Sequence, residues 1–285
     1  MTSSRLVFAV AMLLTSLATS AEANRFADNP EFVIDRKSEA WTGPIGELQS
    51  IRQKVERRDT QTATITNAGT GFLVSPCYVL TAAHVVYGDD LTPVPGTDYR
   101  MKFRAGTGVT SPFAGNTTAT PVASGFRDEG GRNDWALLRL NNCIGKRSEI
   151  GWLETSEAHL PNRQDNRAVA DAVALGYATL KERGNLSAES GTLTYEERNS
   201  GLKIFTGSMN PGESGGPVMI LENGLLNVFA LNKGSSATGL SMVQSIYEVV
   251  NRPNVKAMLD QDKAEWGLPN PNLPRLRMSL LPQRM

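Results

Sequence analysis

Short apolar segments separated by Gly, Pro, Asn and Ser run through most of this chain from residue 60 onward. Residues 72–74 and 78–80 flank a Ser-Pro pair, which predicts two strands joined by a tight turn. Further strands are predicted at residues 99–103, 117–122, 135–140, 168–176, 191–195, 202–205, 217–221 and 226–231. Many short strands with regular turn signals indicate an all-β barrel or sandwich.

One late segment has a helical pattern. Its apolar residues recur at the i, i+3, i+4, i+7 spacing of one helix face: Val243, Ile246, Tyr247 and Val250. This predicts a C-terminal helix over residues 242–262, with a break near Pro253. The Pro-rich residues 263–285 are expected to form a tail on the surface. The charged residues 49–58 fit either a short helix or a solvated strand.

The N-terminus has the pattern of a secretory signal. Arg5 precedes an apolar run over residues 6–17, and Ala21-Glu22-Ala23 then offers small residues at the cleavage positions. As a helix the apolar run reaches only about 18 Å, short of a hydrocarbon core of about 30 Å. We therefore expect residues 1–23 to be removed and the protein to be secreted or periplasmic, with no membrane association afterwards. An uncleaved anchor is the alternative.

Length, charge and residue counts limit the domains, binding partners and cofactors that are expected. The 285 residues suit one large domain or two small ones, preceded here by an arm or pro-segment at residues 24–59. Lys and Arg number 29, as do Asp and Glu, so no surplus of positive charge favours nucleic acid or anionic membranes. Two cysteines and two histidines, not at ligand spacing, are too few for a typical zinc site. No metal or organic cofactor is expected.

A glycine-framed serine is the first candidate for chemistry. Ser214 lies in the run P-G-E-S-G-G-P, directly before an apolar strand. A serine nucleophile needs a neutral imidazole to take its proton, a carboxylate to orient that imidazole, and two backbone N–H groups for the oxyanion. Glycines allow the tight backbone that aims such groups. Taken alone, the run also fits a Gly-rich hairpin turn with an incidental serine.

Candidates for the base and the carboxylate are found next to apolar strands. His84 ends the run T-A-A-H directly after an apolar strand, whereas His159 lies in a polar segment before a proline. His84 is therefore the expected base, although a lone buried histidine is often structural. Asp134 stands at the start of an apolar strand, where a carboxylate is partly buried and able to meet an imidazole N–H. The alternative is an ordinary turn aspartate.

Together the three motifs T-A-A-H, D-W-A-L-L and G-E-S-G-G-P, in this order, resemble the chymotrypsin/trypsin-like serine peptidase family. The resemblance covers about residues 60–262. It implies an all-β fold of two six-stranded antiparallel β-barrels, at residues 60–150 and 151–241, with a C-terminal helix. It also implies a secreted serine endopeptidase that hydrolyses peptide bonds of protein or peptide substrates through an acyl-enzyme intermediate.

The resemblance also assigns roles to residues. His84 would be the general base and then the general acid, Asp134 would orient it, and Ser214 would attack the scissile carbonyl. The backbone N–H groups of Gly212 and Ser214 would form the oxyanion hole. The implied substrate-binding residues are Ser208, at the floor of the specificity pocket, the strand from Ala230 to Asn232, and Gly239. Strands following Cys77 and preceding Cys143 are neighbours in this fold, which implies a Cys77–Cys143 disulfide.

Two positions depart from the family pattern. Glu213 stands where the family usually has an aspartate that pairs with a newly cut N-terminus, and no I-V-G-G-like start lies upstream. Activation by that route is therefore not expected. Ser208 carries no charge, which argues against strict specificity for basic residues and favours an apolar or small substrate side chain.

Two other functions compete with this interpretation. A catalytically silent binding protein of the same fold would explain the departure at Glu213 and the missing activation start. An esterase or lipase of the α/β-hydrolase fold would explain the G-x-S-x-G pattern around Ser214. That fold places its histidine after the nucleophile, and no histidine follows Ser214 in this chain. The order of the residues therefore excludes the hydrolase fold.

Overall fold

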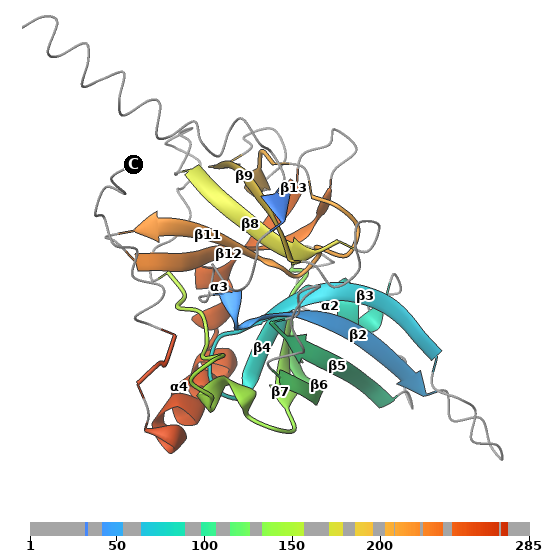
Figure 1. The fold of residues 1–285 in the computed structure, drawn as a ribbon, viewed down its shortest axis with the longest axis vertical. Helices are drawn as coiled ribbons and strands as arrows, with labels where there is room; N and C mark the ends of the chain where they lie inside the picture. The colour runs from blue at the N-terminus through green and yellow to red at the C-terminus, as the bar shows by residue number, and fades with distance from the viewer. Residues whose placement is uncertain are drawn as a thin grey trace, which may run out of the picture.

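The computed structural model describes two β units, one above the other in Figure 1. The described residues are 32–33, 42–53, 64–88, 98–106, 115–125, 133–156, 171–178, 186–195, 203–207, 209–222, 225–235, 241–267 and 269–272. The predicted signal peptide lies outside them, as do most of the N-terminal arm and of the Pro-rich tail. Among the described helices, none is both long and apolar enough to cross a bilayer.

The first unit is a closed six-stranded antiparallel barrel, as predicted. Its strands pair around the barrel in the order β2-β3-β4-β7-β6-β5. They are β2 (Ile45–Gln53), β3 (Thr64–Leu73), β4 (Tyr78–Thr81), β5 (Asp98–Ala105), β6 (Gly115–Ser124) and β7 (Ala136–Leu140). The predicted start of the barrel at residue 60 was wrong, because Ile45–Gln53, in the segment expected to be an N-terminal arm, pairs with β3 and β5 as a strand of the barrel. The hairpin predicted around the Ser-Pro pair is β3–β4, with Phe72 opposite Leu80. The ambiguous residues from 49 onward begin as strand, because β2 continues through Gln53.

Burial explains why these segments form a barrel. In β7 only Arg139 is exposed, so the continuous apolar run is covered on both faces. In β6 buried residues alternate with more exposed ones at its N-terminal end, as expected for a half-buried strand. The resulting core extends beyond the barrel, because Leu175 and Met219 of the second unit belong to the same cluster of buried residues.

The second unit is a seven-stranded antiparallel sheet in the order β1-β9-β10-β13-β12-β11-β8. Its strands are β1 (Phe32–Val33), β8 (Asp171–Tyr177), β9 (Leu186–Tyr195), β10 (Lys203–Phe205), β11 (Pro217–Glu222), β12 (Leu225–Ser235) and β13 (Ser241–Ser245). An additional pairing joins β9 to β8. The closure of this unit as a second six-stranded barrel stays a prediction.

The late helical pattern was wrong at its start. Val243 lies in β13, where it pairs with Lys203 of β10 and Asn232 of β12. Helix α3 (Ile246–Val250) begins only after this strand, and α4 (Pro253–Trp266) follows the predicted break. Pairing with a strand on each side satisfies the backbone of β13, and this tertiary contact overrides a spacing that also fits a helix.

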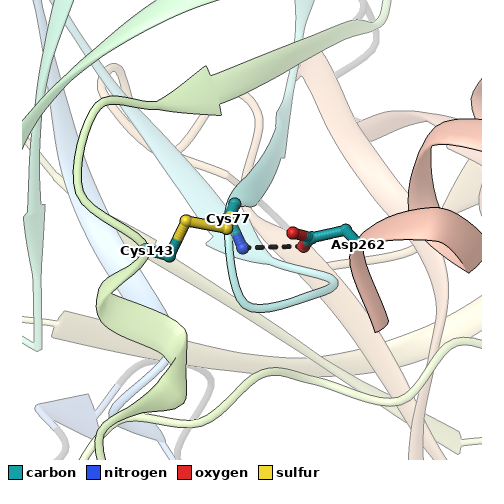
Figure 2. A group of neighbouring side chains, drawn as sticks. All are labelled: Cys77, Cys143 and Asp262. Atoms are coloured by element: carbon teal, nitrogen blue, oxygen red, sulfur yellow. Dashed lines mark hydrogen bonds between the residues drawn. A yellow bond between two sulfur atoms is a disulfide. The ribbon is translucent and has the colours of Figure 1, made fainter. Parts of the chain in front are cut away.

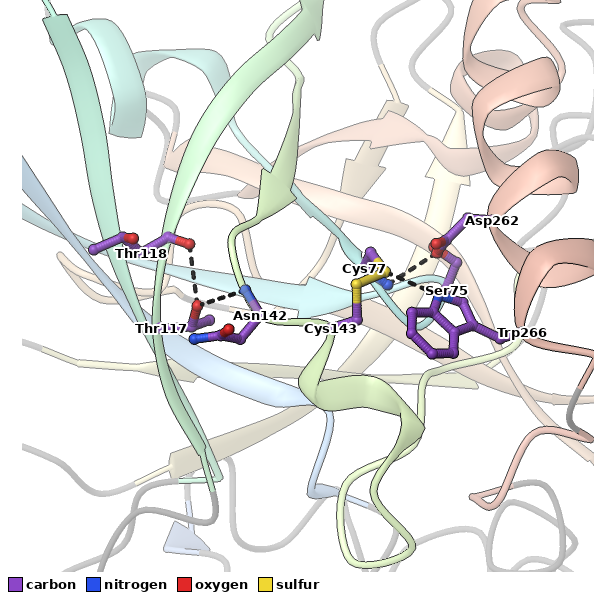
Figure 3. The surroundings of a disulfide bond; sticks show 8 residues. All are labelled: Ser75, Cys77, Thr117, Thr118, Asn142, Cys143, Asp262 and Trp266. Atoms are coloured by element: carbon purple, nitrogen blue, oxygen red, sulfur yellow. Dashed lines mark hydrogen bonds between the residues drawn. A yellow bond between two sulfur atoms is a disulfide. The ribbon is translucent and has the colours of Figure 1, made fainter.

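Helix α4 packs against the first barrel although it comes last in the chain. The Asp262 carboxylate accepts a hydrogen bond from the Ser75 hydroxyl at 2.6 Å. It accepts a second from the backbone N–H of Cys77 at 2.9 Å (Figure 2). Cys77 and Cys143 are joined in a disulfide. The Trp266 indole N–H points to the Cys77 sulfur at 3.3 Å, so the helix covers this disulfide (Figure 3). The C-terminal helix thereby fixes the turn that leads into β4.

Candidate active site

His84 and Asp134 meet at the end of a strand pair in the first barrel. Helix α2 (Ala83–Tyr87) follows β4 directly, and Asp134 precedes β7, with Thr81 opposite Ala136. The Asp134 Oδ2 lies 2.7 Å from the His84 Nδ1. The backbone N–H of His84 donates to the other carboxylate oxygen, Oδ1, at 3.0 Å. Two contacts from one residue therefore fix the carboxylate against the imidazole.

The electrostatics of this pair keep the carboxylate ionised. Burial by itself raises the pKa of Asp134, but the hydrogen bonds and charge of His84, together with the charge of Lys233, outweigh it and lower the pKa below its ordinary value. An ionised carboxylate only accepts, so the His84 Nδ1 is the donor in this contact. The His84 side chain is 27% exposed and that of Asp134 only 11%, so the imidazole is the member of the pair that solvent reaches.

The loop around Ser214 contains two glycines with left-handed backbone. Gly212 and Gly215 have φ values of 97° and 84°, which residues other than glycine rarely adopt. The N–H groups of Glu213, Gly215 and Gly216 each donate to a backbone carbonyl. In the described part of the chain, the N–H groups of Gly212 and Ser214 donate to no protein acceptor. Two N–H groups that donate to no protein acceptor therefore flank Glu213, whose own N–H is bonded.

The same loop is packed against the segment that carries His84. A Cβ on Gly215 would lie 2.9 Å from the backbone nitrogen of Ala82 and closer still to the Thr81 hydroxyl, so only glycine fits there. Ser214 itself is partly exposed. No hydrogen bond between the Ser214 hydroxyl and the His84 ring is present among the described contacts. Catalytic hydrogen bonds of this kind are often long without substrate and tighten when substrate binds.

Thr70, a residue that the sequence analysis missed, holds the loop in place. Its backbone N–H donates to the Ser214 carbonyl at 2.8 Å, and its hydroxyl donates to the Gly212 carbonyl at 2.9 Å. The same hydroxyl accepts from the N–H of Tyr177 in β8 at 2.9 Å. Thr70 is fully buried. Its one sequence signal is a threonine between two glycines in a segment that leads into an apolar strand.

Glu213 faces the interior of the protein. It is 3% exposed, and its carboxylate is hydrogen-bonded to the Ser187 hydroxyl and to the backbone N–H of Asn210, the latter at 2.6 Å. Gly176 leaves room for it, because a Cβ there would lie 2.6 Å from the Glu213 Cβ. The acid that the family pattern links to a new N-terminus is therefore bound by groups within the second unit.

Of the four substrate-binding residues implied by the resemblance, two lie outside the described residues, one lies beside the Ser214 loop and one lies in the core. Ser208 and Gly239 lie outside the described residues, as does His159. Asn232 is buried and lies against the nucleophile loop, with its N–H donating to the Gly216 carbonyl at 2.9 Å. Ala230 is fully buried in the second hydrophobic cluster, which is a core position.

Two further acidic residues, Glu189 of β9 and Asp262 of α4, are buried. Glu189, which the sequence analysis did not single out, is 6% exposed, and its Oε1 would lie 3.1 Å from a Cβ on Gly207. A carboxylate is thus buried beside the loop that precedes the nucleophile. Asp262 lies within 4.8 Å of the sulfurs of Cys77 and Cys143, but sulfurs joined in a disulfide offer no thiolate ligand to a metal.

Several solved structures have a similar fold. The structure is similar to that of a Glu endopeptidase in complex with MPD, with a TM-score of 0.59 and 17% identity over 82% of this chain and 97% of that one. It is also similar to the thermostable serine protease AL20 from an extremophilic microorganism, with a TM-score of 0.57 and 16% identity over 76% and 98% of the two chains. The protease Anisep from Arthrobacter nicotinovorans gives a TM-score of 0.53 and 16% identity over 74% and 94%.

Sequence comparison gives the family. A search of curated protein sequences finds no match. A family model, the trypsin-like peptidase domain, matches residues 69–226, which is more than half of the chain and includes His84, Asp134 and Ser214. The chain therefore belongs to the family of trypsin-like serine peptidases.

Proposed function

We propose that this protein is an active serine endopeptidase with His84, Asp134 and Ser214 as its triad. The observation that carries the proposal is the pair of unpartnered N–H groups at Gly212 and Ser214. An oxyanion hole requires two such donors beside the nucleophile. The fixed His84–Asp134 pair supports the same conclusion.

The geometry leads to a conventional acyl-transfer mechanism. The His84 Nε2 takes the hydroxyl proton as the Ser214 Oγ attacks the scissile carbonyl carbon, and the developing oxyanion accepts hydrogen bonds from the two free N–H groups. The imidazolium then gives its proton to the leaving amine, which leaves an acyl-enzyme. Water repeats these steps, and hydrolysis of the ester releases the acid and restores Ser214. Asp134 stays ionised throughout and stabilises the imidazolium.

We also infer that the protein acts outside the cytosol on protein or peptide substrates. The signal-like N-terminus directs export, and the disulfide between Cys77 and Cys143 persists in an oxidising compartment. The peptidase family supports proteins or peptides as the substrate class. Acyl transfer through a serine triad requires neither a metal nor an organic cofactor.

A fluorophosphonate probe with Ser214→Ala as the matched control tests the proposal. The wild-type protein should be labelled and should cleave a peptide library, while the variant should do neither. Labelling should fall in mild acid, because the imidazole must be neutral to take the proton. A folded wild-type protein that is never labelled would instead favour the catalytically silent binding protein.

A further inference from the structure

The chain between β7 and β8 is bonded to both units. Its residues 152–156, called the linker below, are bonded to a strand at each end. The Leu153 N–H donates to the Leu73 carbonyl of β3, in the first barrel, at 2.8 Å. The Ser156 N–H donates to the Val228 carbonyl of β12, in the second unit, at 2.9 Å. The linker therefore helps to set the position of one unit relative to the other.

The segment after α4 packs against this linker. Asn270 and Asn272 belong to the Pro-rich segment that was expected to be a surface tail, but they are only 7% and 0% exposed. The Asn270 Oδ1 accepts a hydrogen bond from the Trp152 N–H at 3.3 Å. The Asn270 amide in turn donates to the Trp152 carbonyl at 3.0 Å. One side-chain amide thus satisfies both backbone groups of Trp152, as a neighbouring strand would.

The Asn270 carboxamide makes two further contacts. Its Oδ1 also accepts from the backbone N–H of Asn272 at 2.9 Å, and its amide also donates to the Glu154 Oε1 at 2.6 Å. Two bonds accepted and two donated are the full capacity of an asparagine side chain. Gly151 leaves room for the segment, because a Cβ there would lie 2.5 Å from the Asn272 Cβ. The buried contact therefore requires a carboxamide at position 270.

Helix α4 anchors the same segment on the first barrel. Its Asp262 carboxylate is bonded to the Ser75 hydroxyl and to the Cys77 N–H, in the turn between β3 and β4. Leu73, which accepts from the linker, is the last residue of β3 before this turn. Strand β4 then leads directly into α2, which carries His84. The linker and α4 are therefore attached side by side to the hairpin that leads to the candidate base.

We propose that Asn270 is a positioning residue of the peptidase, which fixes the linker and so keeps His84 of the first barrel aligned with Ser214 of the second unit. The inference rests on the proposed function, because alignment of the two units reaches catalysis only if His84 takes the proton of Ser214. Reacting groups tolerate little displacement, and a shift of about 1 Å can cost about 100-fold in rate. A loosened linker lets the units shift and slows the chemical step.

Three substitutions at the contact test this inference. Asn270→Ala removes all four hydrogen bonds. Asn270→Asp keeps the two that are accepted but loses the two donors and places a carboxylate against Glu154. The double variant Asn270→Asp/Glu154→Gln returns a donor to that contact, while Glu154→Gln alone keeps an acceptor there and should be close to neutral. The matched control is Ile220→Ala, which destabilises the core of the second unit without removing a bond to the linker.

The readouts are kcat and KM on one peptide substrate and the rate of labelling by diisopropyl fluorophosphate, at a temperature where every variant is folded. In Asn270→Ala, kcat and the labelling rate should fall by about five- to tenfold with KM nearly unchanged. Asn270→Asp should lose at least as much, and the double variant should recover part of the loss. Ile220→Ala should keep the wild-type kcat. A wild-type kcat in folded Asn270→Ala, or an equal loss in Ile220→Ala, would overturn the positioning role.

Amide hydrogen exchange tests the hold on the linker whether or not the protein is catalytic. The N–H groups of Leu153 and Ser156 should exchange about tenfold faster in Asn270→Ala than in Ile220→Ala, because only the former frees the linker. Equal exchange in the two variants would overturn the role of Asn270, even in a protein whose wild type is labelled normally. A wild-type protein that is not labelled would overturn the peptidase assignment, while exchange would still decide whether Asn270 holds the linker.

Discussion

The backbone N–H of Thr70 donates a 2.8 Å hydrogen bond to the carbonyl oxygen of Ser214, so the first barrel directly holds the proposed nucleophile of the second unit. The Thr70 hydroxyl extends this contact, because it donates to the Gly212 carbonyl and accepts from the Tyr177 N–H. The backbone and side chain of one buried residue thus bond to Gly212, to Ser214 and to β8. The orientation of the two free N–H groups depends on this residue.

Replacing Thr70 should therefore impair catalysis more than folding. Thr70→Val keeps the shape of the side chain but leaves the Gly212 carbonyl without its donor and the Tyr177 N–H without its acceptor. We expect kcat/KM to fall by about 10- to 100-fold, in line with one or two unsatisfied buried groups. Thr70→Ser keeps the hydroxyl and should retain most of the activity. Equal activity of the two folded variants, measured on one peptide substrate, would contradict this role.

Ser187 should matter because it is a partner of the buried Glu213 carboxylate. Ser187→Ala leaves that carboxylate with one fewer donor, and the loop that carries Gly212 should loosen, with a loss of about tenfold in kcat/KM. Ser190 of the same strand is the matched control, because its buried hydroxyl has no hydrogen-bond partner among the described residues. Ser190→Ala should be close to neutral. The comparison is made with steady-state kinetics at one pH, with thermal unfolding to confirm that both variants are folded.

The binding of Glu213 within the protein also predicts that activity needs no free α-amino group near Ser214. The Ser187 hydroxyl and the Asn210 N–H already satisfy the carboxylate that would otherwise recruit one. Proteins beginning at Asn24, with or without a few added residues at the N-terminus, should therefore have equal kcat/KM. A drop of tenfold or more on extension, reversed by cleavage of the added residues, would show that a new N-terminus is required after all.

Local signals predicted several strands of the first barrel, whereas its closure with six strands and the meeting of His84 with Asp134 were implied by the family resemblance. An apolar run such as β7 is recognisable by its residues alone, and the motifs with His84 and Asp134 lie at the ends of paired strands. Val243 was wrongly predicted to be helical because it is one of four apolar residues that fit a helix face. The pairing of β13 with two distant strands leaves no local signal. Thr70, Glu189 and Asn270 were missed for the same reason. Their partners come from segments far away in the chain.

The disulfide beneath α4 should contribute measurably to stability. Cys77 and Cys143 close a loop with a sequence separation of 66, for which the chain-entropy model gives about 4 kcal/mol. Replacing both cysteines with serine should lower the free energy of unfolding by about 2–4 kcal/mol in urea titrations. Asp262→Ala should also destabilise, by roughly 3 kcal/mol, because it leaves the buried Ser75 hydroxyl and Cys77 N–H without their acceptor. Thiol labelling of the denatured, unreduced wild type should find no free cysteine.

Asp134→Asn should separate the chemical role of the carboxylate from its structural one. The asparagine side chain has a single acceptor oxygen and no negative charge to stabilise the imidazolium. We therefore expect kcat to fall by about 10⁴-fold at pH 7. The pKa of Asp134 lies below its ordinary value in the folded protein, so its ionised form stabilises the fold above the unfolded pKa, and this contribution is lost as the pH falls through the folded value. The difference in free energy of unfolding between wild type and Asp134→Asn should therefore shrink as the pH falls below about 4. A difference that grows in acid would mean that the carboxylate is not ionised in the folded protein.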